Sequence, residues 1–392
     1  MPSNRPTRGR CATAGLAALA LLALGACSTA SGGAGAAATG GGSGAPAGPI
    51  VVTATDTECT LSAATAAAGT VTFRITNQGS KTNEFYVYAT GDRIVGEVEN
   101  ITPGLSRELK IEMSDPGTLT TACKPGMVGD GIRAAFVVTG TAAPSKTDEK
   151  VAAAIAAYTT YVGTQADDLV AKTTEFVAGV KAGDVAAAKA LYPRARLPWE
   201  RIEPVAASFG DLDPKIDGRE DVVSEGTAFT GYHRLEKDLW IDGLQADSAA
   251  IADQLLADVT TIAADAKKVE LTGLSIASGA KALLDEVATG KVTGEEERYS
   301  HTDLSDFQGN VEGSAAALDA LQPVIQARQP ALQTTLDSTY QALWAALTSH
   351  RDTTGAYVAY TALTPDQVKT LSVTLDAFSE QVAQVPAVVE QT

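Results

Sequence analysis

The chain has 392 residues, of which 45% are hydrophobic, 20% are charged and 5% are aromatic. This length and composition fit two or three folded domains and exclude a chain that is disordered throughout. With 47 acidic and 30 basic residues the formal net charge is −17. That charge excludes nucleic acid and anionic lipid as main partners and favours small cations.

The first 49 residues have the pattern of an export signal followed by a spacer. Residues 1–10 contain three arginines and no acid, and residues 11–26 are nearly all apolar. We predict that 1–26 is a lipoprotein signal peptide, because the tetrapeptide Leu-Gly-Ala-Cys at 24–27 resembles a bacterial lipobox. Cys27 would then carry the lipid. The alternative is a simple N-terminal membrane anchor.

A tether is predicted over residues 27–49, which are rich in Gly, Ala, Ser and Thr. A flexible coil of about 22 such residues spans about 25 Å, and it would hold the body of the protein at that distance from a membrane.

Residues 50–140 are predicted to form a small β-sandwich. Alternating apolar and polar residues, β-branched side chains and turn signals such as Asp115-Pro116-Gly117 favour strands. The expected strands are 49–55, 69–77, 83–88, 106–113 and 134–139.

The rest of the chain is predicted to be helical, after a short linker at 141–148. In 151–180 apolar residues recur at steps of three, four or seven. Asp184 and Thr364 are expected to cap the helices that follow them, with Pro365 at the first helical position. Further helices are expected at 245–269, 273–289, 308–328, 330–349 and 365–390.

Pro193, Pro198 and Pro204 are expected to divide the region 184–208 into short pieces. The simplest architecture for 149–392 is a pair of packed helical bundles.

A His-x-x-Glu pair, His233 and Glu236, is the first candidate for chemistry. On a helix the two side chains share a face, and an imidazole with carboxylates suits iron, manganese or zinc. An exposed ion pair of these side chains with Arg234 or Lys237 is the alternative, and the spacing by itself favours it.

Two other segments strengthen the metal interpretation. Residues 197–204 place two glutamates beside Trp199 and between prolines, and residues 294–303 contain three consecutive glutamates followed by His301 and Asp303. Two of the three histidines of the chain lie in 231–237 and 294–303.

These segments resemble the imelysin-like family over almost the whole mature chain. The resemblance rests on WERIEPVAASFGDLDPKIDGRE (199–220), GYHRLEKDLW (231–240) and EEERYSHTDLSDFQGNVEG (295–313). It implies a cupredoxin-like β-sandwich followed by an imelysin-like helical-bundle domain. The implied metal ligands in the helical domain are His233, Glu236, Glu200, one of Glu295, Glu296 and Glu297 (with Glu296 preferred), and Asp217.

The same resemblance makes the β domain a candidate for iron or copper. Its candidate ligands are Glu84, Glu97, Glu99, Cys59, Cys123 and Met127. No histidine precedes His233, whereas a blue-copper centre needs two histidines and a cysteine. In an oxidising compartment a disulfide between Cys59 and Cys123 is an equally good interpretation.

The resemblance implies a subunit of a three-part iron importer, which is not an enzyme. Its partners would be an iron permease in the membrane and a Dyp-type haem peroxidase. The protein would be exported, anchored by lipid to the outer face of the cytoplasmic membrane, and monomeric.

The alternative is an imelysin-type zinc metallopeptidase with Glu236 as general base, although the chain has no His-Glu-x-x-His motif. A third interpretation is a polysaccharide-binding lipoprotein, which would need a bridging cation because the chain is itself acidic.

Overall fold

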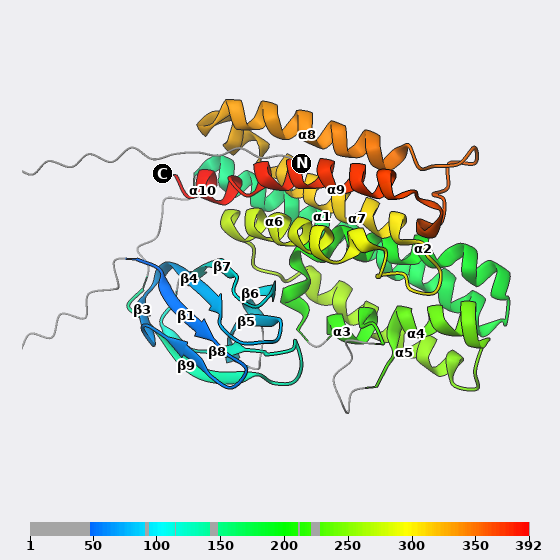
Figure 1. The fold of residues 1–392 in the computed structure, drawn as a ribbon, viewed down its shortest axis with the longest axis horizontal. Coiled ribbons are helices and arrows are strands. Elements are labelled where there is room, and N and C mark those ends of the chain that lie inside the picture. The colour runs from blue at the N-terminus through cyan, green and yellow to red at the C-terminus, as the bar shows by residue number, and fades with distance from the viewer. Residues whose placement is uncertain are drawn as a thin grey trace, which may run out of the picture. The chain divides into compact units, whose positions relative to one another are not determined.

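The computed structural model describes residues 48–90, 94–113, 115–141, 148–210, 212–220 and 228–391. The predicted signal peptide, the lipidation site Cys27, most of the tether and linker residues 142–147 lie outside the described residues. Within them the strands come first and the helices follow (Figure 1).

The strands are β1 (Ile50–Ala54), β2 (Cys59–Leu61), β3 (Thr65–Ala67), β4 (Gly69–Asn77), β5 (Asn83–Tyr88), β6 (Ile94–Ile101), β7 (Ser106–Met113), β8 (Gly117–Cys123) and β9 (Ile132–Thr139). The longer helices are α1 (Glu149–Lys181), α2 (Val185–Ile202), α5 (Ser248–Ala266), α6 (Gly273–Thr289), α7 (Asp303–Arg328), α8 (Pro330–Thr348) and α9 (Pro365–Val382). The shorter ones are α3 (Leu212–Asp217), α4 (Gly231–Lys237), α10 (Val385–Val389), the 3-10 segments η2 (Glu203–Phe209), η4 (Lys291–Thr293) and η5 (Tyr360–Ala362), and the π-helical segment η3 (Asp238–Asp242).

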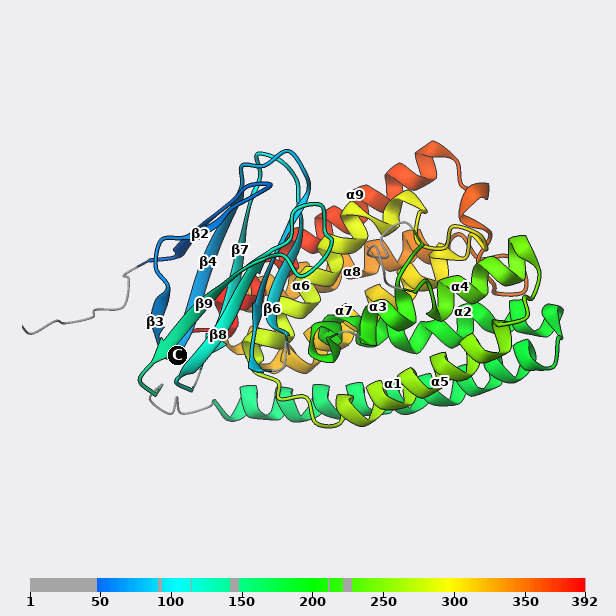
Figure 2. The same ribbon diagram turned by 90° about the horizontal axis from the view of Figure 1, so that it is seen from below.

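The strands form two sheets, in the orders β2-β1-β4-β7 and β3-β9-β8-β5-β6, which face each other in Figure 2. The pairs β1–β4 and β3–β9 are parallel, and the other pairs are antiparallel. Phe73, Phe85 and Phe136 are fully buried between the sheets, and the ring of Phe73 lies 5.3 Å from each of the other two. The structure thus confirms the predicted β-sandwich.

The strand prediction was incomplete, because the structure adds β2, β3, β6 and β8. In β6 the apolar alternation is interrupted by Gly96, Glu97 and Glu99. A strand with this composition carries little of the periodic signal on which a prediction depends.

In the helical half, the longest helix, α1, agrees with the helix predicted from the apolar pattern of 151–180. Helix α1 packs against α2, α5 and α7 and buries most of the predicted stripe. Asp184 accepts the N–H of Ala187, and Thr364 forms a reciprocal capping box with Gln367, so both predicted caps are confirmed.

Two helix predictions are wrong. Pro193 and Pro198 lie inside the continuous helix α2, where each proline costs on the order of 3 kcal/mol. Packing of α2 between α1 and α7 buries Tyr192 and Trp199 completely and offsets that cost. The helix predicted at 365–390 is interrupted between α9 and α10, and α10 begins beside Pro386.

Among the described residues, no helix is both long enough and apolar enough to cross a membrane.

Candidate metal centre

His233 and Glu236 lie one turn apart on α4, and their side chains are 2% and 0% exposed. Nδ1 of His233 lies 3.3 Å from Oε2 of Glu236. The predicted alternative of an exposed ion pair is wrong, because both side chains are buried and Arg234 and Lys237 pair with other acids.

Glu236 also anchors the segment that carries Glu296. Its Oε1 accepts the backbone N–H of Tyr299 at 2.9 Å and that of Ser300 at 2.7 Å. These bonds fix the turn that follows η4 against α4. As a result, Oε1 of Glu296 lies 3.6 Å from Nε2 of His233.

Asp217, the last residue of α3, completes the surroundings of the imidazole. Its Oδ1 lies 3.4 Å from Nε2 of His233. The ligand atoms of Asp217, His233 and Glu296 all lie within 4.8 Å of one another, and so do those of His233, Glu236 and Glu297. Four residues predicted as ligands, from three separate segments, therefore meet in one place.

The contact between α3 and α4 explains a glycine at the start of α4. Gly231 has φ +77°, and a Cβ at this position would lie 2.3 Å from the carbonyl oxygen of Ile216. A larger residue would push α4 away from α3 and separate His233 from Asp217.

Glu200, predicted as a third ligand, lies outside both groups. Its Oε1 binds Arg196 at 2.5 Å, and its Oε2 binds Lys291 and Asn310, both at 2.9 Å. The structure therefore places Glu200 between two buried cations rather than at the imidazole.

Arg196 and Lys291 are buried counter-ions for the acidic interior. Arg196 also pairs with Asp217, with Glu297 at 2.6 Å and with Asp306 at 3.3 Å. Lys291 binds both oxygens of Glu203 at 2.9 Å. Charges this deep are tolerated because they are paired and hydrogen-bonded.

The electrostatics favour the ionised form of Asp217, Glu236 and Glu296, whereas burial raises the pKa of Glu297 well above the ordinary range. Burial raises the pKa of Asp217 and of Glu236, but Arg196 and His233 respectively lower both values below the ordinary range. Burial likewise raises the pKa of Glu296, and Lys291 and His233 lower it well below the ordinary range.

The pKa of His233 is shifted in the opposite direction to the pKa values of the three ionised carboxylates. Burial and the Arg196 charge lower the pKa of His233, but the three neighbouring carboxylates of Asp217, Glu236 and Glu296 raise it well above its ordinary value. A metal ion that binds this imidazole must therefore displace a proton.

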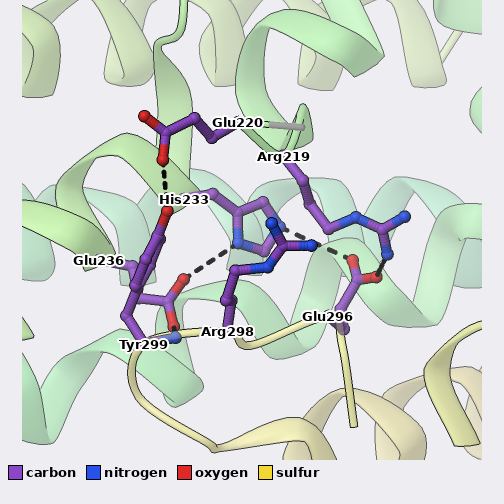
Figure 3. Close-up of a pocket in the computed structure, with 7 residues that line it drawn as sticks. All are labelled: Arg219, Glu220, His233, Glu236, Glu296, Arg298 and Tyr299. Atoms are coloured by element: carbon purple, nitrogen blue, oxygen red, sulfur yellow. Dashed lines mark hydrogen bonds and ion pairs between the residues drawn. The ribbon is translucent and has the colours of Figure 1, made fainter. Parts of the chain in front are cut away.

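A small pocket connects the site with the surface. It is lined by Arg219, Glu220, His233, Glu236, Glu296, Arg298 and Tyr299 (Figure 3). Its cavity volume of about 10 Å³ admits about one water molecule. In Figure 3 the imidazole lies between Glu236 on one side and Glu296 on the other.

The candidate carboxylates of the β domain meet on strands β5 and β6. The Tyr86 hydroxyl lies 3.2 Å from Oε2 of Glu84 and 3.0 Å from Oε1 of Glu99, and Glu97 pairs with Tyr86 in the ladder. Burial raises the pKa of Glu99 to about 7, helped by the charge of Glu84.

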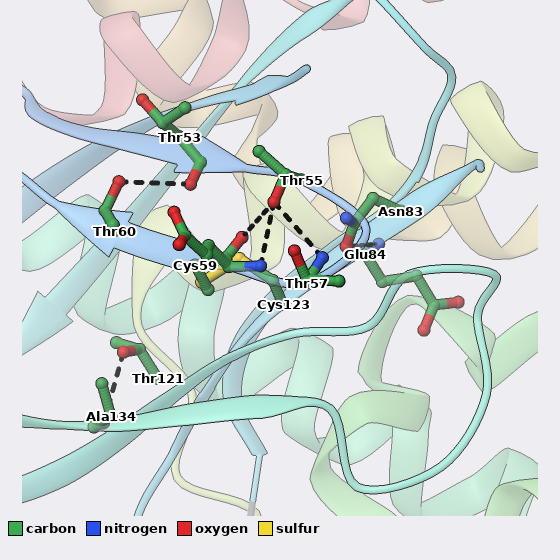
Figure 4. The surroundings of a disulfide bond; sticks show 11 residues. Thr53, Thr55, Thr57, Cys59, Thr60, Asn83, Glu84, Thr121, Cys123 and Ala134 are labelled. Carbon is green, nitrogen blue, oxygen red and sulfur yellow. Dashed lines mark hydrogen bonds between the residues drawn. A yellow bond between two sulfur atoms is a disulfide. The ribbon is translucent and has the colours of Figure 1, made fainter. Parts of the chain in front are cut away.

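Cys59 and Cys123 are joined in a disulfide (Figure 4), so they do not offer thiolate ligands in this structure. The sequence left open whether these cysteines form a disulfide or bind a metal, and in the structure they form the disulfide. Glu84 lies near the bond but points away from it in Figure 4.

Sequence reasoning missed the buried cations and Asp306. A weak signal existed for Arg196, which precedes Glu200 by four residues on the same helix. Lys291 and Asp306 reach the cluster only through the packing of η4 and α7, and no local spacing indicates this.

Comparison with known proteins agrees with the fold. The imelysin family model matches residues 154–385, and the model of the cupredoxin-like domain matches residues 16–138. The chain therefore belongs to the class of proteins in which a cupredoxin-like sandwich is joined to an imelysin-type helical domain.

Curated relatives extend this assignment to most of the chain. Iron uptake system component EfeO of Escherichia coli O157:H7 is 37% identical over 345 residues, which cover 86% of this chain and 91% of that protein. The EfeO proteins of E. coli K12 and Shigella flexneri are 36% identical over the same lengths. The chain belongs to the EfeO branch of the imelysin family.

Proposed function

We propose that this protein is the iron-binding lipoprotein of an Efe-type uptake system and passes iron to a membrane permease. The names of its relatives support a role as an iron uptake system component. The remaining parts of the proposal rest on its site, its charge and its N-terminal sequence.

The observation that carries the proposal is the group formed by Asp217, His233 and Glu296, whose ligand atoms lie within 4.8 Å of one another; His233 and Glu296 are buried, and Asp217 is partly buried. One imidazole with two ionised carboxylates is a donor set that suits iron. The small pocket above it fits a single ion rather than an extended ligand.

Location and partners follow from the export signal. Lipid on Cys27 and the tether would keep the acidic body beside the membrane, on the outer face of the cytoplasmic membrane. There it would meet an iron permease and a Dyp-type haem peroxidase. A net charge of −17 raises the local concentration of cations.

The β domain offers a second group of candidate iron ligands. Glu84, Glu97 and Glu99 offer oxygen ligands only, and with the two cysteines bridged this set suits iron better than copper.

Iron accumulation in cells tests the function. In a strain that lacks the chain, wild-type protein should restore uptake of radioactive iron, whereas Glu296→Gln should not. Cys27→Ala should lower uptake because the protein is no longer held at the membrane. Full uptake with Glu296→Gln, at equal protein levels, contradicts the proposal.

The imelysin family model is also named as a peptidase family, and that name favours the alternative of a zinc metallopeptidase. Incubation with an unfolded protein substrate separates the two functions. We expect no chelator-sensitive cleavage. Cleavage that chelators abolish and that is lost in His233→Ala would establish the peptidase instead.

A further inference from the structure

The imidazole of His233 has a different carboxylate environment at each of its two nitrogens. Nδ1 faces Glu236 at 3.3 Å, whereas Nε2 faces Asp217 at 3.4 Å and Glu296 at 3.6 Å. A metal ion at Nδ1 would use Glu236 and Glu297, and an ion at Nε2 would use Asp217 and Glu296. The hydrogen bonds of the site distinguish these two arrangements.

At the Nδ1 side the carboxylate oxygens already have donors. Oε1 of Glu236 takes two backbone N–H groups, and its Oε2 faces Nδ1. For Glu297, Oε1 takes Arg196 at 2.6 Å and the Tyr192 hydroxyl at 3.2 Å, and Oε2 takes the Ser300 hydroxyl at 2.9 Å. On each of these two carboxylates one oxygen already has two donors and the other has one, so a cation here finds fewer open acceptor positions than at the Nε2 side.

At the Nε2 side some polar atoms lack a hydrogen-bond partner among the described residues. Nε2 of His233 is buried and has no hydrogen-bond partner among the described residues. Oε2 of Glu296 accepts from Arg219 at 2.7 Å, but Oε1 lies 3.6 Å from Arg196 and 4.0 Å from Lys291, beyond hydrogen-bond distance.

Asp217 has room for one more interaction. Its Oδ1 accepts from Arg196 and its Oδ2 from the indole N–H of Trp199 at 2.8 Å. Each carboxylate oxygen has two acceptor positions, so Oδ1 keeps one for an ion while Arg196 holds the group in place.

We infer that the metal ion binds Nε2 of His233 together with Asp217 and Glu296, and that Glu236 is a positioning residue rather than a ligand. Glu236 accepts the Nδ1 proton and thereby presents the unprotonated Nε2 to the ion. Carboxylates that orient a metal-bound imidazole in this way are common, and their loss weakens binding by about 10- to 100-fold. This inference rests on the proposed iron site.

Proton NMR of the full-length chain in detergent, loaded with ferrous iron without oxygen, identifies the bound nitrogen. A histidine ligand of high-spin ferrous iron shows one strongly shifted, exchangeable N–H signal from its unbound nitrogen. In protein labelled with ¹⁵N only at histidine Nδ1, we expect this signal to be split by the label. Splitting only with the Nε2 label, or the absence of a shifted exchangeable signal, would overturn the assignment.

Two variants separate positioning from ligation. Glu236→Gln should weaken ferrous binding by about 10- to 100-fold and speed the exchange of the shifted proton. Glu296→Gln should cause a larger loss. Abolished binding in Glu236→Gln with nearly normal binding in Glu296→Gln would overturn the inference.

The outcomes also separate this inference from the proposed function. If wild-type protein fails to bind ferrous and ferric iron, the proposed function itself is wrong. If iron binds but the split signal belongs to the other nitrogen, only the assignment of ligands is wrong.

Discussion

At the scale of single residues, the site depends on two cations that no metal motif contains. Lys291 is 2% exposed and binds Glu200 and Glu203, so its loss leaves buried carboxylates unpaired. Such losses typically cost about 3–5 kcal/mol. We expect Lys291→Met to lower the free energy of unfolding by that amount, measured by urea denaturation at neutral pH.

Lys281→Met is the matched control. Lys281 forms an ion pair with Asp285, four residues away on α6, with both side chains more than a third exposed. Such pairs contribute about 0.5 kcal/mol or less. Equal, small losses in the two lysine variants would contradict the role of Lys291 as a buried counter-ion.

The β domain offers a pH prediction, because burial raises the pKa of Glu99 to about 7. The folded state keeps a proton that the unfolded chain releases near pH 4.5, so folding becomes less favourable as pH rises from about 4.5 to about 7. The variant Glu99→Gln should therefore gain melting temperature relative to wild type between pH 5 and pH 8, by calorimetry with a chelator present. A constant difference across that range would contradict the raised pKa.

The contribution of Asp217 to stability depends on pH in the opposite direction to that of Glu99. Its pKa is lowered well below the ordinary value of a free carboxyl, so its contribution to stability is present at neutral pH and disappears as acid protonates it.

At the residue scale the sequence predicts local geometry where spacing determines it. His233 and Glu236 converge because they are three residues apart on a helix, and Asp217 and Glu296, which lie beside them, were proposed through family resemblance. Burial is a tertiary property, so the sequence did not exclude an exposed ion pair. Arg196 and Lys291 depend on contacts between α2, η4 and α7 that no local pattern indicates.

At the scale of elements, the site is positioned by the contact between α3 and α4. We expect Gly231→Ala to destabilise the protein and weaken iron binding, because a non-glycine residue at φ +77° costs on the order of 1–2 kcal/mol and its Cβ meets Ile216. Denaturation and iron titration of the same preparation measure both effects.

Gly163→Ala on α1 is the control, since its Cβ would meet nothing within 4 Å. Alanine in a helix should stabilise it by about 0.5–1 kcal/mol and leave iron binding unchanged. A Gly231→Ala protein with normal iron affinity would show that α3 and α4 do not set the site.

Elements were predictable where periodicity is strong, as in α1, and where capping residues are explicit, as at Asp184 and Thr364. They were missed where packing overrides local preference. The two prolines in α2 and the polar strand β6 are examples, because each is supported by neighbours distant in sequence.

At the scale of the molecule, the disulfide joins β2 of one sheet to β8 of the other across 64 residues of sequence. Closing a loop of this length lowers the entropy of the unfolded chain and stabilises the fold by about 4 kcal/mol. A Cys59→Ala, Cys123→Ala double variant should melt earlier in its β domain, as followed by calorimetry.

Iron binding in the helical domain should survive this change, because Asp217, His233 and Glu296 all lie outside the sandwich. Loss of binding together with the disulfide would mean that the β domain holds the iron.

The central claim, that iron binds in the helical domain, is tested most directly by calorimetric titration of iron into paired variants. Wild type, Glu296→Gln and Glu84→Gln are titrated with ferric citrate and, without oxygen, with ferrous iron. We predict that the tightest binding event is lost in Glu296→Gln and kept in Glu84→Gln. Loss in Glu84→Gln with full binding in Glu296→Gln would contradict the claim and move the iron to the β domain.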